Sequence, residues 1–172
     1  LENADKLDFD VSRYSCGDPI KEGIIKSYIH MVLQYKLVYR WKDLFIYVNV
    51  PEILEEVLDI CINIFNYYEH EKEPEQFIQK MVENTIIIYY NALTEFASFY
   101  YVTGVYELAE KFLQIVEANA EEIKTFNPGC LIKLYQILYG IHSSSGENEK
   151  ANKYLKKYAE LESEVQDEKY FG

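Results

Sequence analysis

Residues 103–113, TGVYELAEKFL, and residues 146–155, GENEKANKYL, each place an alanine five positions after a glycine. In the first segment the pair is Gly104 with Ala109, and the second pair follows 42 residues later. Apolar residues at three- and four-residue steps lie on both sides of each glycine, which is the spacing of amphipathic helices. Each segment therefore predicts a helix, a short turn that contains glycine, and a second helix.

The same spacing extends outward through the rest of the chain. Asp18-Pro19 and Asn127-Pro128 each combine a capping residue with a proline in the first turn, and Val50-Pro51 also restarts the pattern. No glycine or proline lies between residues 75 and 101, so we expect one long helix or two nearly continuous helices there, although Ile86-Ile87-Ile88 alone favours a strand. About six or seven helices are expected, near residues 19–40, 51–69, 75–101, 105–117, 128–141 and 147–164, with an irregular aromatic stretch through Tyr47.

The composition agrees with a single helical domain. The chain has 172 residues, of which 49% are apolar, so it can bury a core and is not intrinsically disordered. It contains only 7 Gly and 4 Pro, too few for a sandwich of many short strands. We expect an all-α domain over residues 18–164, with loose segments at residues 1–17 and 165–172.

Charge and cysteine usage restrict the partners and the location. The formal net charge of −12 counts against direct binding of nucleic acid or of an anionic membrane. No segment reaches the roughly 18–20 apolar residues of a membrane span. Cys16, Cys61 and Cys130 are scattered and odd in number, which favours buried thiols in a reducing compartment. The sequence therefore predicts a cytoplasmic protein.

Residues that could carry catalysis are few and dispersed. The sequence lacks the short motifs that bind phosphates, dinucleotides or zinc. The three histidines, His30, His70 and His142, are widely separated. Cys130 and His142 would stand about 18 Å apart on one helix, too far to form a nucleophile–base pair. We expect no enzymatic activity, no cofactor and no metal.

A polar stripe runs through the most apolar part of the chain. Asn84, Asn91 and Ser98 recur every seven residues, which returns nearly to the same side of a helix. An amide offers a donor and an acceptor, so the stripe suits the backbone of an extended peptide. Alternatively, the asparagines cap turns, bond to neighbouring helices or face water. With flanking residues and two tyrosines that could wall a groove, the candidate peptide-binding residues are Asn84, Tyr90, Asn91, Thr94, Glu95, Ser98 and Tyr101.

Tyrosines also occur as adjacent pairs, among them Tyr89-Tyr90 and Tyr100-Tyr101. Neighbouring residues on a helix point in different directions, so each pair predicts one inward and one outward ring. Outward rings suit the recognition of a protein or peptide, whereas core packing is the ordinary role of the inward ones.

The two glycine–alanine segments resemble the tetratricopeptide repeat (TPR), a helix–turn–helix unit of about 34 residues. Ala97 and Ala109 fall where the repeat needs small side chains at its helix crossing. The second segment has diverged, as its 42-residue spacing shows. The resemblance implies a right-handed solenoid of stacked antiparallel helical hairpins that recognises a peptide, a protein segment or a second copy in a homodimer, as an adaptor or chaperone-like scaffold does. The matching positions of the first segment are Leu93, Phe96, Ala97, Tyr100, Gly104, Tyr106, Ala109, Leu113 and Val116.

A more distant resemblance concerns residues 84–101, the following glycine turn, and the Gly-Glu-Asn-Glu-Lys-Ala start of the last helix at residues 146–151. These look similar to the C-terminal regulatory domains of peptide-responsive bacterial transcription regulators of the Rgg/GadR/MutR type. That resemblance implies a domain that senses a peptide and dimerises. It also requires a DNA-binding domain before Leu1, because this sequence contains no basic recognition helix.

Overall fold

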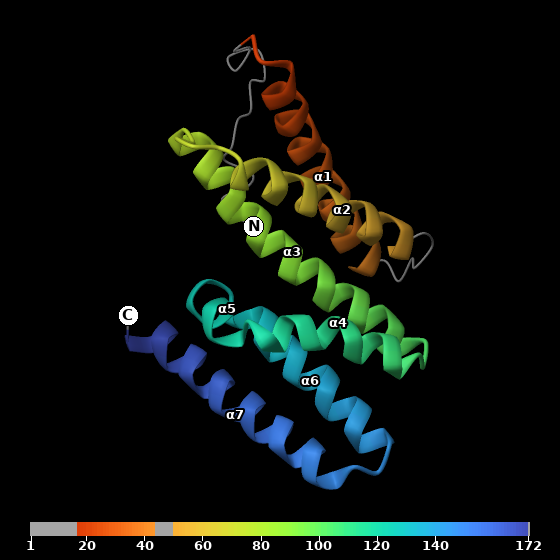
Figure 1. The fold of residues 1–172 in the computed structure, drawn as a ribbon. Coiled ribbons are helices and arrows are strands. Elements are labelled where there is room, and N and C mark those ends of the chain that lie inside the picture. The colour runs from red at the N-terminus through yellow and green to blue at the C-terminus, as the bar shows by residue number, and fades with distance from the viewer. Residues whose placement is uncertain (1–16, 44–49, 172) are drawn as a thin grey trace.

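The computed structural model describes residues 17–43 and 50–171, and in that part of the chain every regular element is an α-helix. The expectation of an all-α fold is therefore confirmed. Residues 41–43, the start of the irregular stretch expected through Tyr47, are helical. The rest of that stretch and all but one residue of the expected N-terminal segment lie outside the described residues. The described helices are α1 (Pro19–Asp43), α2 (Val50–Glu69), α3 (Gln76–Val102), α4 (Tyr106–Ala118), α5 (Ala120–Phe126), α6 (Pro128–Ser144) and α7 (Asn148–Phe171) (Figure 1).

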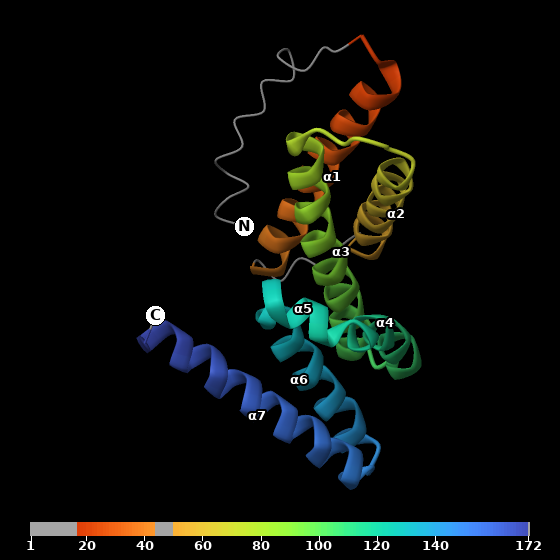
Figure 2. The ribbon, with the colours of Figure 1, turned by 60° about the vertical axis from the view of Figure 1, so that its left-hand side comes forward.

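Long helices that follow one another in the chain pack as neighbours. α1 lies against α2, α2 against α3, α3 against α4, and α6 against α7. Two views show the members of each pair running in opposite directions (Figure 1 and Figure 2). α3 also contacts α1 and α6, so it joins the N-terminal pair of helices to the C-terminal pair.

The two turns that contain glycine share one geometry. Gly104 and Gly146 have φ values of 80° and 75°, in the left-handed region that glycine adopts without strain. In the first turn the Val105 amide donates to the Tyr100 carbonyl at 2.8 Å, and in the second the Glu147 amide donates to the His142 carbonyl at 2.9 Å. These bonds close the ends of α3 and α6 in the manner of a Schellman motif. The similarity of residues 103–113 and 146–155 is thus matched by similar turns.

The expected helix starts are also present. Asp18 Oδ1 accepts hydrogen bonds from the amides of Ile20 and Lys21 at 2.9 and 3.3 Å at the start of α1. Asn127 Oδ1 accepts from the Cys130 amide at 3.4 Å at the start of α6, with a proline in the first turn. Both side chains satisfy amide groups that have no partner within their helix.

Two apolar clusters make up the core, and α3 contributes to both. One contains residues of α1, α2 and α3, including Ala92 and Phe96. The other contains residues of α3, α4, α5, α6 and α7, including Leu93 and Ala97. Neighbouring positions on α3 therefore face different clusters, which makes α3 the central helix of the structure.

One helix end and one additional helix differ from expectation. α7 continues to Phe171, so the expected tail of residues 165–172 is almost entirely helical. The segment lacks glycine until residue 172 and contains no proline, so nothing in it ends the helix. In addition, α5 forms a short helix that the apolar pattern did not predict. Its first turn carries Glu121 and Glu122, and its last turn carries Lys124, a charge order that complements the helix dipole.

Candidate functional site

The predicted polar stripe on α3 is engaged in contacts between helices. Asn84 Nδ2 donates to the Tyr28 hydroxyl of α1 at 3.3 Å. The Asn91 side-chain oxygen accepts from Asn127 Nδ2 at 2.8 Å, just before α6. Ser98 is half-buried on the same helix. For the two asparagines, these contacts correspond to the alternative in which they bond to neighbouring helices, and their role in binding a peptide stays a prediction.

The two polar residues beside the stripe are buried. Thr94 Oγ1 donates to the Tyr90 carbonyl at 2.8 Å and lies 3.1 Å from Cys130 Sγ. Glu95 forms an ion pair with Lys133, which joins α3 to α6. These side chains stabilise the contact of α3 with α6 and offer little surface to a ligand.

The two tyrosines predicted as groove walls, Tyr90 and Tyr101, pack within the C-terminal half. The Tyr90 ring lies 6.4 Å from that of Phe126, centroid to centroid, and burial raises its pKa. The Tyr101 ring lies 5.8 Å from that of Tyr106, and its hydroxyl end rests against Gly140 of α6. The other tyrosine of each adjacent pair has a different environment.

Those other tyrosines, Tyr89 and Tyr100, line an open apolar cavity that we call the α2–α4 groove. It has a volume of about 390 Å³. α3 provides the floor, and α2 and α4 provide the walls. The lining residues are Glu55, Leu58, Asp59, Ile62, Tyr89, Leu93, Phe96, Tyr100 and Phe112.

Aromatic rings in mutual contact form one end of this groove. The centroids of Phe96 and Phe112 are 4.7 Å apart, and the ring of Tyr100 stacks on Phe112 at 6.0 Å with an interplanar angle of 5°. Phe96 and Tyr100 are 5.4 Å apart. Because each ring contacts the other two, the cluster presents a surface fixed by packing rather than three independent side chains.

The apolar surface continues from the groove onto α4. Leu108, Phe112 and Ile115 follow one another at four and three residues, so they share a face of the helix. Leu108 and Ile115 are 36% and 43% exposed, and Ile62 on the opposite wall is 46% exposed. Contiguous exposed apolar surface of this kind marks sites of interaction more often than single exposed residues do.

The α2 wall gives the groove an acidic rim. Glu55 and Asp59 are exposed one turn apart, and among the described residues neither carboxylate has a hydrogen-bond or ion-pair partner. Their neighbour Glu56 instead contacts His30 Nε2 at 2.9 Å. α2 contains no lysine or arginine, so this wall is negatively charged.

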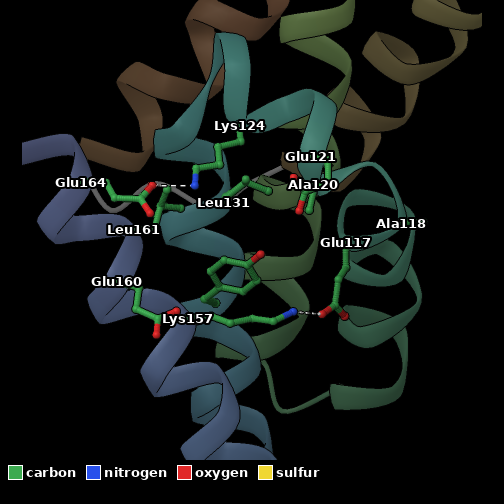
Figure 3. A pocket seen from close by; sticks show the side chains of 11 residues that line it. Glu117, Ala118, Ala120, Glu121, Lys124, Leu131, Lys157, Glu160, Leu161 and Glu164 are labelled. Atoms are coloured by element: carbon green, nitrogen blue, oxygen red, sulfur yellow. Dashed lines mark hydrogen bonds and ion pairs between the residues drawn. The ribbon is translucent and has the colours of Figure 1, made fainter. Parts of the chain in front are cut away.

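A second hollow, of about 330 Å³, lies among α4, α5, α6 and α7, and two ion pairs cross it. Lys157 of α7 reaches Glu117 of α4 at 3.0 Å, and Lys124 of α5 reaches Glu164 of α7 at 2.6 Å (Figure 3). The lining residues are Glu117, Ala118, Ala120, Glu121, Lys124, Leu131, Tyr135, Lys157, Glu160, Leu161 and Glu164.

Aromatic contacts complete this junction. Lys157 Nζ lies 5.1 Å from the centre of the Tyr135 ring, and the Tyr154 hydroxyl donates to Glu117 at 3.1 Å. Burial and the Glu117 carboxylate raise the pKa of Tyr154 to about 12. The ion pairs and aromatic contacts around this hollow therefore hold α7 against α4 and α6. In the α2–α4 groove, by contrast, the apolar lining and two carboxylates remain open to a ligand. The α2–α4 groove is the better candidate for a binding site.

The described cysteines and the buried histidine do not form a nucleophile–base pair. Burial raises the pKa of Cys61 to about 12 and also raises that of Cys130, which disfavours the reactive thiolate at either position. His142 Nδ1 lies 2.6 Å from Glu147, and Nε2 lies 3.7 Å from Glu110. Both ring nitrogens of His142 thus face carboxylates.

Metal-binding clusters and membrane-spanning helices are both absent from residues 17–43 and 50–171. Over these ranges, no group of three or more His, Cys, Asp or Glu side chains is arranged to hold a metal ion. Within the same part of the chain, no helix has both the length and the apolar character needed to cross a membrane.

A scan against protein-family profiles and searches of curated proteins and of solved structures found no match to the chain.

Proposed function

We propose that this chain is a non-catalytic protein-interaction module, an adaptor or chaperone-like scaffold, that holds a segment of another polypeptide in the α2–α4 groove. The observation that carries the proposal is an open groove lined by apolar and aromatic side chains, with Ile62 exposed on one wall, beside two rim carboxylates that have no partner among the described residues. Apolar pockets with a few polar groups at the edge are the usual form of binding sites.

The absence of catalysis is part of the same proposal. The described thiols, Cys61 and Cys130, are buried and have raised pKa values. The groove itself is lined by apolar and aromatic residues and by two exposed carboxylates. The buried free thiols also support a reducing compartment, so we place the protein in the cytoplasm.

A TPR-like solenoid is the architecture that we propose for this module. The α3–α4 and α6–α7 pairs support it, because both close on a left-handed glycine with similar hydrogen bonds. Ala97 and Ala109, at which the resemblance calls for small side chains, are both fully buried, and this supports the proposal. A surface that binds polypeptides is what such helical stacks provide.

A peptide selection tests the proposed function. A phage library of random dodecapeptides is selected on the purified chain, and recovered peptides are titrated against Ile62→Glu and against Leu155→Glu. Ile62 and Leu155 are 46% and 42% exposed, but only Ile62 lines the groove, so the second variant is a matched control. We expect binding to weaken at least about tenfold in Ile62→Glu alone, because a charge would be buried against the ligand. Equal binding by both variants, or no enrichment of peptides, would refute the proposal.

A further inference from the structure

The walls and floor of the α2–α4 groove are formed only by helices, and this restricts what can bind there. The inference rests on the proposed function and concerns the kind of segment that the groove takes. The backbone amides and carbonyls of α2, α3 and α4 are bonded within their own helices along the lining residues. An extended peptide would therefore bury its own backbone groups against apolar side chains without partners. A helix brings its backbone hydrogen bonds with it, as in helix-in-groove recognition.

The floor has the spacing that a helix needs. Tyr89, Leu93, Phe96 and Tyr100 lie at steps of four, three and four residues along α3. At 1.5 Å per residue this stripe is about 16 Å long, the length of about three helical turns. An amphipathic helix presents apolar side chains over the same steps, so its apolar face can cover the floor and insert between Ile62 and Phe112.

The negative charge of the groove rim favours amphipathic helices that carry basic side chains. Glu55 and Asp59 stand on one wall with no ion-pair partner among the residues that the structure describes. The net charge of the chain, −12, adds a long-range attraction for cations. A bound helix with Lys or Arg beside its apolar face would place those side chains next to the two carboxylates.

We infer that the α2–α4 groove binds a basic amphipathic helix of another protein. The apolar face of that helix covers Tyr89, Phe96 and Phe112, and its basic side chains pair with Glu55 and Asp59. Apolar contact supplies most of the affinity. The two carboxylates make the groove prefer basic helices over neutral or acidic ones, and they speed up association.

A second copy of this chain is the competing occupant. α1 exposes Leu33 and Leu37, 57% and 38% exposed, on the same side as the exposed cations Lys26 and Arg40. If α1 of one molecule entered the groove of another, the chain would self-associate in proportion to its concentration, and Leu33→Glu would abolish that association.

The test uses three synthetic peptides of about five turns, or about 18 residues. The first is a Leu/Lys peptide with one apolar face, the second carries Glu in place of Lys, and the third has the composition of the first in an order that removes the apolar face. Binding is measured by titration calorimetry, and helix formation by circular dichroism, on the wild type, Ile62→Glu and Glu55→Gln/Asp59→Asn. Glu149→Gln/Glu162→Gln removes two charges from α7 and serves as the control.

We expect only the first peptide to bind tightly and to become helical. Its affinity falls at least about tenfold in Ile62→Glu and about 3- to 10-fold in Glu55→Gln/Asp59→Asn, with little change in the control. Equal binding of the acidic or the reordered peptide, or equal weakening in both double variants, overturns the basic-helix inference but leaves the proposed function intact. If Ile62→Glu changes the binding of no peptide, both the proposed function and the basic-helix inference are contradicted.

Sedimentation experiments test the second copy as occupant. Self-association that Leu33→Glu abolishes, with no binding of the first peptide, would identify a second copy as the occupant and overturn the inference.

Discussion

Tyr101 of α3 occupies the space in which a side chain at Gly140 of α6 would begin. A Cβ atom at residue 140 would overlap the hydroxyl oxygen of Tyr101 and lie 2.8 Å from its ring carbon Cζ. Gly140 therefore permits a close contact between α6 and α3, the helix that contributes to both apolar clusters of the core. This glycine lies inside a helix, where glycine is otherwise unfavourable.

Gly140→Ala should lower the free energy of unfolding by about 1–2 kcal/mol, because Tyr101 would have to leave its place against α6. Urea unfolding followed by far-ultraviolet circular dichroism measures this change. In the background of Tyr101→Ala the same substitution should become stabilising, by up to about 1 kcal/mol, because only the helix propensity of alanine remains.

Gly23→Ala is the control for this prediction. Gly23 lies inside α1. Apart from its two chain neighbours and the backbone of its own helix, no atom of the described residues lies within 4 Å of the position that a Cβ would take there. Alanine at residue 23 should therefore stabilise the protein in either background. A stabilising effect of Gly140→Ala in the otherwise wild-type chain would show that the contact with Tyr101 is not restrictive.

Asn91→Ala separates the two interpretations of the polar stripe. The bond between Asn91 and Asn127 at 2.8 Å predicts a loss of about 0.5–1.5 kcal/mol in the free energy of unfolding. A double-mutant cycle with Asn127→Ala should give a coupling energy of similar size, since each variant removes the same bond. Asn63→Ala, on the exposed face of α2, should change stability by less than about 0.5 kcal/mol. Zero coupling, together with weaker peptide binding by Asn91→Ala, would instead favour the peptide-binding role.

The sequence was sufficient to predict the helices because its period and its breakers are local signals. Asp18, Asn127, Gly104 and Gly146 act on the few residues next to them, and the structure shows each of them at a helix end. α5 was missed because seven residues are too few to show a helical period.

The candidate site was harder to predict because it depends on which helix lies opposite each face of α3. The adjacent pairs Tyr89-Tyr90 and Tyr100-Tyr101 predicted one outward ring in each pair, and the sequence favoured Tyr90 and Tyr101 as the walls of a groove. The structure places Tyr89 and Tyr100 in the α2–α4 groove because α2 and α4 pack on that side of α3. The asparagine stripe faces α1 and the start of α6, a packing relationship that no local spacing reveals.

Tyr154→Phe should loosen α7 selectively. The variant keeps the ring, which stacks with Tyr135 at 6.3 Å, and loses the hydroxyl that donates to Glu117. We expect a loss of about 1 kcal/mol and faster amide hydrogen exchange in α7, with α1 and α2 unchanged. Tyr158→Phe is the matched control, because no hydrogen bond of its hydroxyl is found in the described part of the chain. If the amide hydrogens of α7 exchange at the same rate in both variants, the Tyr154–Glu117 hydrogen bond does not hold α7 in place.

Cys61 should make the protein less stable as the pH rises above 9. Its pKa is raised by burial from 9.0 to about 12, so above pH 9.0 the unfolded chain releases a proton that the folded chain retains. The stabilising contribution is therefore complete below pH 9.0 and is lost as the pH rises toward 12, at about 1.4 kcal/mol per pH unit. Urea unfolding at several pH values measures the slope. It is read close to pH 9, because partly buried tyrosines such as Tyr154 add a slope of the same sign as the pH approaches 10.0, the ordinary pKa at which they titrate in the unfolded chain.

Cys61→Ala should reduce this slope, although the truncation also lowers stability at neutral pH. Ile64→Val, a fully buried truncation one turn further along α2, provides the matched control, since it should lower stability by about 0.5–1.5 kcal/mol and keep the wild-type slope. Any slope that remains in Cys61→Ala is expected from Cys130 and, toward pH 10, from tyrosines such as Tyr154, because burial raises the pKa of each of these groups. A slope in Cys61→Ala equal to that of the wild type would mean that the thiol of Cys61 reaches water before the chain unfolds, and that the packing of α2 against α1 and α3 opens locally at alkaline pH.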